Sequence, residues 1–80
     1  MSKGYTHYII NIPESAEIHD YMGDKTAFRV YDELTPEKIL FYFMLSPMYK
    51  SLSKEEQEEL TNILTLQLEK EFNLWLSILE

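Results

Sequence analysis

The stretch LTPEKILFYFML, residues 34–45, combines a clear helix start with an unbroken apolar run. Thr35 is suited to the N-cap, and Pro36 is suited to the first helical position, where a backbone N–H is not needed. The run from Ile39 to Leu45 is apolar on every side of a helical wheel, which is typical of a helix buried all round. We therefore expect a central core helix that begins at Pro36 and ends near Leu45.

Two segments before this helix have the composition of β-strands. YTHYIINI, residues 5–12, is rich in Tyr, Thr and Ile and stops at Pro13. TAFRVYDEL, residues 26–34, alternates apolar and polar side chains around Phe28 and Val30. Because two strands alone make a poor parallel sheet, we expect the pair to be antiparallel.

The segment between these strands, PESAEIHDYMGDK, has the signals of a short helix or helical turn. Pro13 suits the first turn of a helix, and Gly23 is placed to end it. An amphipathic helix here would bury only a short stripe, which consists of Ile18, Tyr21 and Met22.

The strongest boundary signal in the chain lies at Ser53, because Glu56 three residues later completes a capping box. A helix from about Lys54 to Leu79 should follow, and the preceding SPMYKSL should form a brief turn capped by Ser46. At 1.5 Å per residue this last helix would be about 39 Å long. A domain of this size is only about 30 Å across. Either one end of the helix protrudes or another surface covers it.

The last helix carries two apolar stripes that together span about 220° of its circumference. The first stripe should pack on the sheet or the core helix and consists of Leu64, Leu68, Phe72, Trp75 and Leu79. The second stripe consists of Leu60, Ile63, Leu74 and Ile78, and the seam between the stripes is formed by Gln67 and Glu71. Three alternatives follow: a groove of the same domain buries both stripes, the second stripe binds another protein or a second copy, or Glu71 is catalytic.

Length and composition restrict the class of fold and function. The 80 residues make one domain, 1–80, of the α+β class, with a two-stranded sheet packed on two to three helices. Fourteen acidic residues against 7 basic ones give a net charge of −7, which repels nucleic acid and anionic membranes. Cysteine is absent, and no apolar segment suits a signal peptide or a membrane span. We therefore expect a cytoplasmic protein.

Motifs for catalysis and ligand binding are scarce. The chain lacks a G-x-S-x-G turn, and its 2 glycines cannot build a phosphate-binding loop. The one candidate for a metal site is ESAEIHD, where Glu14, Glu17, His19 and Asp20 lie close together in sequence. In a helix Glu17 and Asp20 would share a face while His19 points elsewhere, so no two strong ligands have a standard pairing. We therefore expect no metal, no cofactor and no enzyme activity. A competing interpretation is a small ligand-binding or catalytic site around Tyr5, His7, Arg29 and Tyr31.

The remaining features favour a protein that inhibits or regulates another protein by binding it. Six tyrosines, 4 phenylalanines and 1 tryptophan are many aromatic residues for this length, and Tyr and Trp are enriched at binding hot spots. The predicted surface for a partner protein or a homodimer consists of Leu60, Ile63, Gln67, Glu71, Leu74 and Ile78. A second, acidic surface consists of Asp20, Asp24, Asp32, Glu33, Glu55, Glu56 and Glu59. Several inhibitors encoded by phages and mobile elements present carboxylates in place of phosphates, and this chain resembles them in size and charge. A phosphate-mimicking inhibitor of a nucleic-acid-binding enzyme is therefore an alternative.

Overall fold

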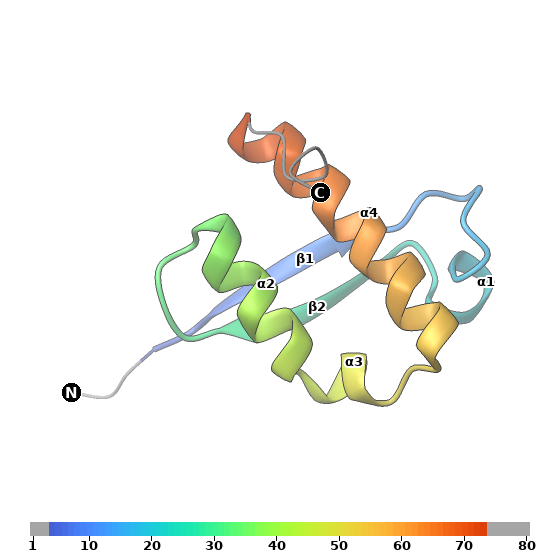
Figure 1. The fold of residues 1–80 in the computed structure, drawn as a ribbon, viewed down its shortest axis with the longest axis horizontal. Coiled ribbons are helices and arrows are strands. Elements are labelled where there is room, and N and C mark those ends of the chain that lie inside the picture. Colours follow the sequence, from blue (N-terminus) through green and yellow to red (C-terminus); the bar gives the residue numbers. More distant parts are fainter. Residues whose placement is uncertain (1–3, 74–80) are drawn as a thin grey trace.

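The fold is a two-stranded antiparallel sheet with helices against one face (Figure 1). The computed structural model describes residues 4–73. In chain order the elements are β1 (Thr6–Asn11), α1 (His19–Met22), β2 (Lys25–Val30), α2 (Pro36–Leu45), α3 (Pro47–Lys50) and α4 (Lys54–Phe72). This arrangement belongs to the α+β class that the sequence predicts.

The two strands pair with Tyr8 opposite Phe28, so the predicted antiparallel pairing is confirmed. Alternate side chains, including Tyr8 and Phe28, are buried, and those between them are mostly exposed. β2 ends at Val30, not at Leu34 as expected. Val30 is opposite Thr6, where β1 begins, so the following residues have no opposing strand. One face of the sheet therefore packs on the core, and the other faces solvent.

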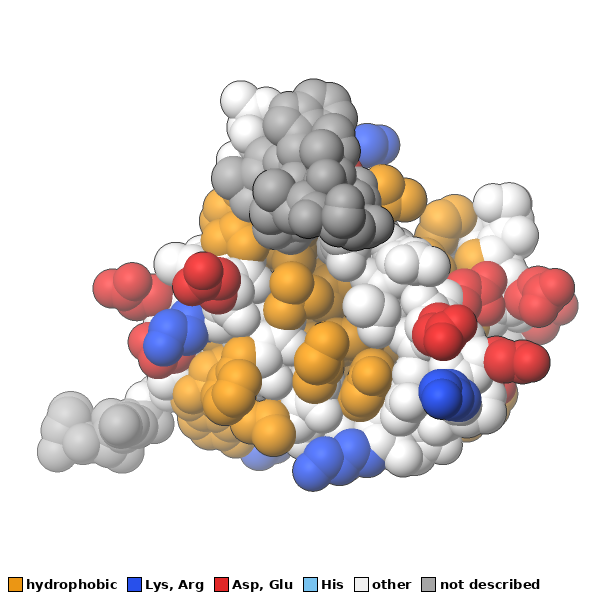
Figure 2. Space-filling view, in the orientation of Figure 1, with side chains coloured by type: hydrophobic (Ala, Val, Ile, Leu, Met, Phe, Trp, Pro, Cys, Tyr) orange, Lys and Arg blue, Asp and Glu red, His pale blue; other side chains and the backbone are white. Residues whose placement is uncertain are grey.

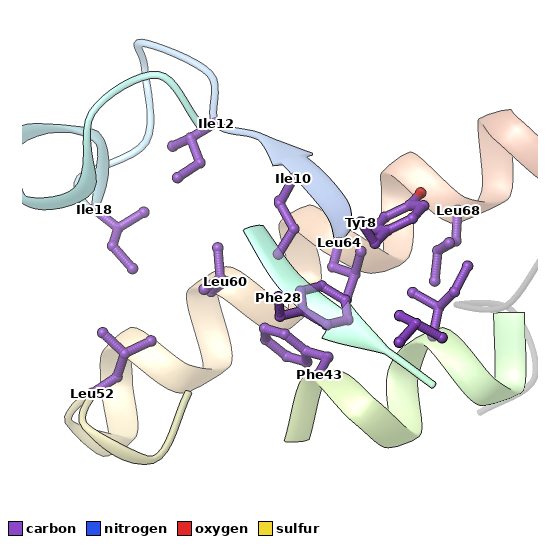
Figure 3. Close-up of a cluster of buried hydrophobic side chains, with 12 residues drawn as sticks. Tyr8, Ile10, Ile12, Ile18, Phe28, Phe43, Leu52, Leu60, Leu64 and Leu68 are labelled. Carbon is purple, nitrogen blue, oxygen red and sulfur yellow. The ribbon is translucent and has the colours of Figure 1, made fainter. Parts of the chain in front are cut away.

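The core lies between the sheet and two helices, with α2 packed against β2 and α4 against β1. Figure 3 shows Phe28 of β2 beside Phe43 of α2, and their ring centroids are 5.6 Å apart. Three leucines of α4, Leu60, Leu64 and Leu68, are completely buried in the same cluster. The prediction that Leu64 and Leu68 pack inward is confirmed.

The helix α2 has the predicted start and end, but it is not buried all round. The Thr35 hydroxyl oxygen accepts the Lys38 N–H at 3.3 Å, which confirms the predicted N-cap. Only Ile39 and Phe43 are buried, so the prediction of a helix buried on every side is wrong. β2 covers one face of α2, and a chain of this length has too little structure to cover every other face.

The two short helices follow their predicted boundary signals in part. Gly23 ends α1 with a φ of 85°, a conformation that glycine adopts readily. Ile18 is buried as expected, but Tyr21 is 64% exposed because a single helical turn has little surface to bury. The Ser46 hydroxyl oxygen accepts the Tyr49 N–H at 3.3 Å and caps α3, as predicted.

The long helix α4 begins at the predicted capping box and ends earlier than predicted. Ser53 N–H donates to Glu56 Oε1 at 2.9 Å, and Glu56 N–H donates to Ser53 Oγ at 3.2 Å. Asn73 adopts a left-handed φ of 57° and caps the helix after Phe72. The 19-residue helix is about 28 Å long. This length fits within the domain, so α4 needs no protruding end. The described residues do not include Leu74, Trp75, Ile78 and Leu79.

Candidate functional site

The partner surface predicted on the last helix is largely used inside the fold. Leu60 is completely buried, and Ile63 is half-buried and packs against the core. Leu60 therefore fills the interior of the domain and is not available to a partner. Leu74 and Ile78 lie outside the described residues. The described part of this stripe is thus arranged as in the first alternative, in which a groove of the same domain buries both stripes.

Gln67 binds the outer edge of β1 much as a neighbouring strand would. Its Oε1 accepts the Asn11 N–H at 2.9 Å, and its Nε2 donates to the Ile9 carbonyl oxygen at 2.8 Å. The same Nε2 donates to the Tyr8 hydroxyl oxygen at 3.3 Å. Gln67 therefore covers backbone groups of an edge strand that would otherwise be open to pairing with another chain.

Glu71 accepts a hydrogen bond from the hydroxyl of Tyr8, a buried residue of β1. Burial and this hydrogen bond raise the pKa of Tyr8 to about 12, because both disfavour the charged phenolate. Glu71 and Gln67 thus tie α4 to β1 inside the molecule. Their spacing in the sequence places them on one helix face but does not identify the strand that this face contacts.

The predicted acidic residues form two separate groups, and Figure 2 shows carboxylates gathered at both sides of the molecule. One group precedes α2 and consists of Asp32 and Glu33. The other lies around α1 and the start of α4 and consists of Asp20, Asp24, Glu55, Glu56 and Glu59. The structure therefore does not combine the seven predicted residues into one surface.

Several of these carboxylates have partners within the protein. Lys38 Nζ lies 3.1 Å from an Asp32 carboxylate oxygen, and its pKa is raised by this hydrogen bond. His19 Nε2 lies 2.7 Å from Asp24 Oδ1. Glu59 Oε2 accepts the Glu17 N–H at 2.9 Å. These contacts give part of the acidic surface a local structural role.

The most exposed group of apolar side chains on a helix consists of Phe41, Met44 and Leu45, which we call the α2 stripe. These side chains are 55%, 46% and 49% exposed, respectively. Their i, i+3, i+4 spacing places them on one face of α2, and Figure 2 shows hydrophobic side chains over this helix between the two acidic groups. Adjacent exposed apolar side chains, unlike isolated ones, mark interaction surfaces.

Sequence reasoning missed the α2 stripe because the whole run around it is apolar. The buried residues of α2, Ile39 and Phe43, recur at a spacing of four, and the stripe recurs on a different face. This separation into two faces, combined with a sheet of only two strands, is the signal that could have found the stripe.

The four residues of the competing ligand-site interpretation lie together near one end of the sheet. The Tyr5 ring centroid lies 5.2 Å from that of His7 and 5.5 Å from that of Tyr31. The Arg29 guanidinium carbon lies 4.7 Å from the Tyr5 centroid, within range of a cation–π interaction. A hydrogen bond to Tyr31 raises the pKa of Arg29, so the guanidinium stays charged.

An open hollow of about 580 Å³ lies beside this cluster. Ala27, Phe28 and Arg29 line it from β2, and Tyr42, Leu45 and Met48 line it from the end of α2 and from α3. His7 also lines the hollow but has no hydrogen-bond partner among residues 4–73. The described lining of the hollow includes no carboxylate, and its Ser46 hydroxyl bonds the Phe43 carbonyl oxygen and the Tyr49 N–H, so the hollow itself has no acid–base pair or activated nucleophile among residues 4–73.

The described part of the chain contains no group of three or more His, Asp or Glu side chains able to share a metal ion. No helix within residues 4–73 is both long and apolar enough to cross a membrane. No protein-family model matches the chain, and comparisons with curated proteins and with solved structures find no match either.

Proposed function

We propose that this protein is a small acidic interaction module that inhibits or regulates another protein by binding it through the α2 stripe. The exposure of Phe41, Met44 and Leu45 on one helix face is the observation that supports the proposal. Full burial of a side chain of this type stabilises by about 1.5–3 kcal/mol relative to full exposure. In the isolated domain the exposed part of these side chains contributes none of this free energy. A partner that covers the stripe would bury that part, and the free energy gained would stabilise the complex.

The charge around the stripe supports a partner with an apolar centre and a basic rim. Acidic groups lie on both sides of the hydrophobic side chains over α2 (Figure 2). Opposite charges at the rim of an interface speed up association and fix its orientation. A second copy is a less favourable partner than a different protein, because each copy has a net charge of −7.

We further propose that the protein acts in the cytoplasm as a binding protein and not as an enzyme. The absence of cysteine supports this location, because small secreted domains commonly depend on disulfides. His7 lines the hollow but has no hydrogen-bond partner among residues 4–73 that would orient it as a base. This observation supports binding over catalysis.

The test is affinity capture from cells of the source organism with the wild type, Met44→Glu and the control Leu66→Glu. Leu66 lies on α4 and is 57% exposed, so the control places the same charge on an apolar surface outside the stripe. The wild type and Leu66→Glu should retain the same partner. Met44→Glu should reduce its recovery about tenfold or more, because a carboxylate would be buried in an apolar contact.

Recovery of the same proteins by all three variants would contradict the proposal. Light scattering distinguishes a second copy from a different partner. A wild-type dimer that becomes monomeric in Met44→Glu, but not in Leu66→Glu, would identify the partner as a second copy. A monomeric wild type is the expected result.

A further inference from the structure

The hydrogen bonds of β1 show which backbone groups of the sheet point outward. Gln67 binds Ile9 and Asn11 from the side opposite β2, so the odd-numbered residues of β1 direct their N–H and C=O groups away from β2. The Ile12 N–H donates to the Asp24 carbonyl oxygen at 2.8 Å, which places the even-numbered residues on the β2 side. Both observations give the same alternation.

The strand register shows which backbone groups of β2 point toward β1 and which point away from it. Tyr8 is opposite Phe28, and Ile10 is opposite Thr26, so these are the hydrogen-bonded pairs. The N–H and C=O groups of Lys25, Ala27 and Arg29 therefore point away from β1. Among the described residues no side chain binds them as Gln67 binds β1. Within residues 4–73 the sheet thus has one covered edge and one open edge.

The hollow of about 580 Å³ is lined by residues of β2 and of the α2–α3 connection, so it borders β2. Ala27 and Arg29 on the solvent face of β2 and Phe28 on its core face line the same hollow. Because consecutive residues of β2 from both faces of the sheet line this space, it lies along the edge of the strand. Leu45 and Met48 form the apolar wall on the opposite side.

We propose that the open edge of β2 binds an extended, acidic segment of the partner protein as a third strand of the sheet. The inference rests on the proposed function, because it specifies how the partner binds. Such a segment would pair with the outward N–H and C=O groups of Lys25, Ala27 and Arg29, and its alternate side chains would enter the hollow. Backbone pairing supplies affinity in this mode, and the hollow selects the side chains.

The charge of this edge determines the chemistry of the segment. β2 contains Lys25 and Arg29, and no carboxylate of the described residues 4–73 lines the hollow, although the chain as a whole has a net charge of −7. A segment with an Asp or Glu near an apolar residue complements this edge. Self-pairing of β2 would bring two lysines and two arginines into one small sheet, so a second copy is the less favourable occupant.

The test uses displayed random peptides of about ten residues, the length of a long strand, selected on the full-length protein. Selected peptides should contain an acidic residue and alternating apolar residues. In the wild type, hydrogen exchange at the amides of Lys25, Ala27 and Arg29 should slow when a peptide is bound. Thr26 and Phe28 already donate to β1 and should change little.

Ala27→Pro and its control Ala27→Val test whether the outward N–H of residue 27 is needed for peptide binding. Proline removes the outward N–H without removing a bond to β1 and is tolerated at sheet edges, whereas valine keeps the N–H. Peptide binding should weaken about tenfold or more in Ala27→Pro and change less than about threefold in Ala27→Val. Arg29→Glu should weaken binding of acidic peptides and provides a second test if Ala27→Pro does not fold.

Three results would overturn the inference: no selected peptide, unchanged exchange at Lys25, Ala27 and Arg29 in the bound wild type, or equal binding by the wild type and the folded edge variants. The native partner separates this inference from the proposed function. Partner capture lost in Met44→Glu but retained in Ala27→Pro would preserve the α2 stripe and reject the strand pairing. Capture lost in Ala27→Pro but retained in Met44→Glu would reject the stripe and preserve the edge.

Discussion

The helices α2 and α4 build the same core from sequences of opposite character. α2 is apolar throughout its second half, yet its only buried residues are Ile39 and Phe43. α4 is rich in charged residues, yet it buries Leu60, Leu64 and Leu68 completely. Burial follows from the face of each helix that meets the sheet and not from the number of apolar residues in the helix.

This difference indicates separate uses for the apolar residues of α2. Those that face β2 hold the domain together, and the α2 stripe, where we propose that a partner binds, remains exposed. α4 has the reverse arrangement, because its leucines fill the core and its polar Gln67 and Glu71 fasten it to β1. Substitutions on each helix can therefore separate stability from binding.

The largest expected effect is that of Phe43→Ala, compared with Phe41→Ala on the same helix. Phe43 is completely buried against Phe28, so its truncation should lower the free energy of unfolding by about 3–5 kcal/mol. Phe41 is 55% exposed, and its truncation should change stability by less than about 1 kcal/mol. Urea denaturation measures both. Similar losses would show that Phe41 belongs to the core and would remove the separation between the two faces of α2.

The boundaries of α2 and α4 could be predicted because their signals are local. Thr35 with Pro36, and Ser53 with Glu56, lie within three residues of the bonds that they make at each helix start. Early termination of α4 depends on the left-handed Asn73, which was not recognised as a C-cap in the sequence. Local chemistry therefore predicted where the helices begin better than where they end.

The candidate surfaces could not be predicted in the same way because they depend on contacts distant in sequence. Gln67 binds the carbonyl of Ile9, 58 residues away, and no local pattern specifies that pairing. The exposure of Met44 likewise depends on the absence of a further layer over α2 in a sheet of two strands. Tyr5, His7, Arg29 and Tyr31, the group of the competing interpretation, lie together because the strand register sets His7 opposite Arg29.

A smaller effect on stability is expected when the hydrogen bonds between α4 and β1 are removed. We compare Gln67→Met, which removes them, with the control Gln57→Met. Gln67→Met removes three hydrogen bonds to β1 and should lower the free energy of unfolding by about 1–3 kcal/mol. The Gln57 side chain makes one hydrogen bond, from Nε2 to the Tyr49 carbonyl oxygen, so the control should lose about 0.5–1 kcal/mol. Urea denaturation at neutral pH measures both variants.

Equal losses from the two glutamine variants would contradict the special role of Gln67. Gel filtration provides a second readout for the same pair. Gln67→Met uncovers the outer edge of β1 and should promote self-association, because an exposed edge strand is a template for pairing. Gln57→Met leaves that edge covered and should remain at the size of the wild type.

The smallest effect is expected for Tyr8→Phe, which removes the hydroxyl that joins β1 to Glu71. Loss of this hydrogen bond should reduce stability by about 1 kcal/mol at neutral pH. The pKa of Tyr8 is about 12 in the folded protein and 10.0 in its ordinary state, so folding favours the protonated phenol. The stability that depends on this protonation is fully present below about pH 10 and is lost as the pH rises toward 12.

Urea denaturation of the wild type and Tyr8→Phe from neutral pH to about pH 12 measures this loss as a difference between the two curves. The difference should shrink above about pH 10, because only the wild type has a phenol to ionise at residue 8. In Glu71→Gln the pKa of Tyr8 should fall but stay above 10.0, because burial remains and is the largest cause of the shift. A difference that is constant with pH would show that Tyr8 ionises as easily in the folded chain as in the unfolded one, and that α4 does not bury its hydroxyl.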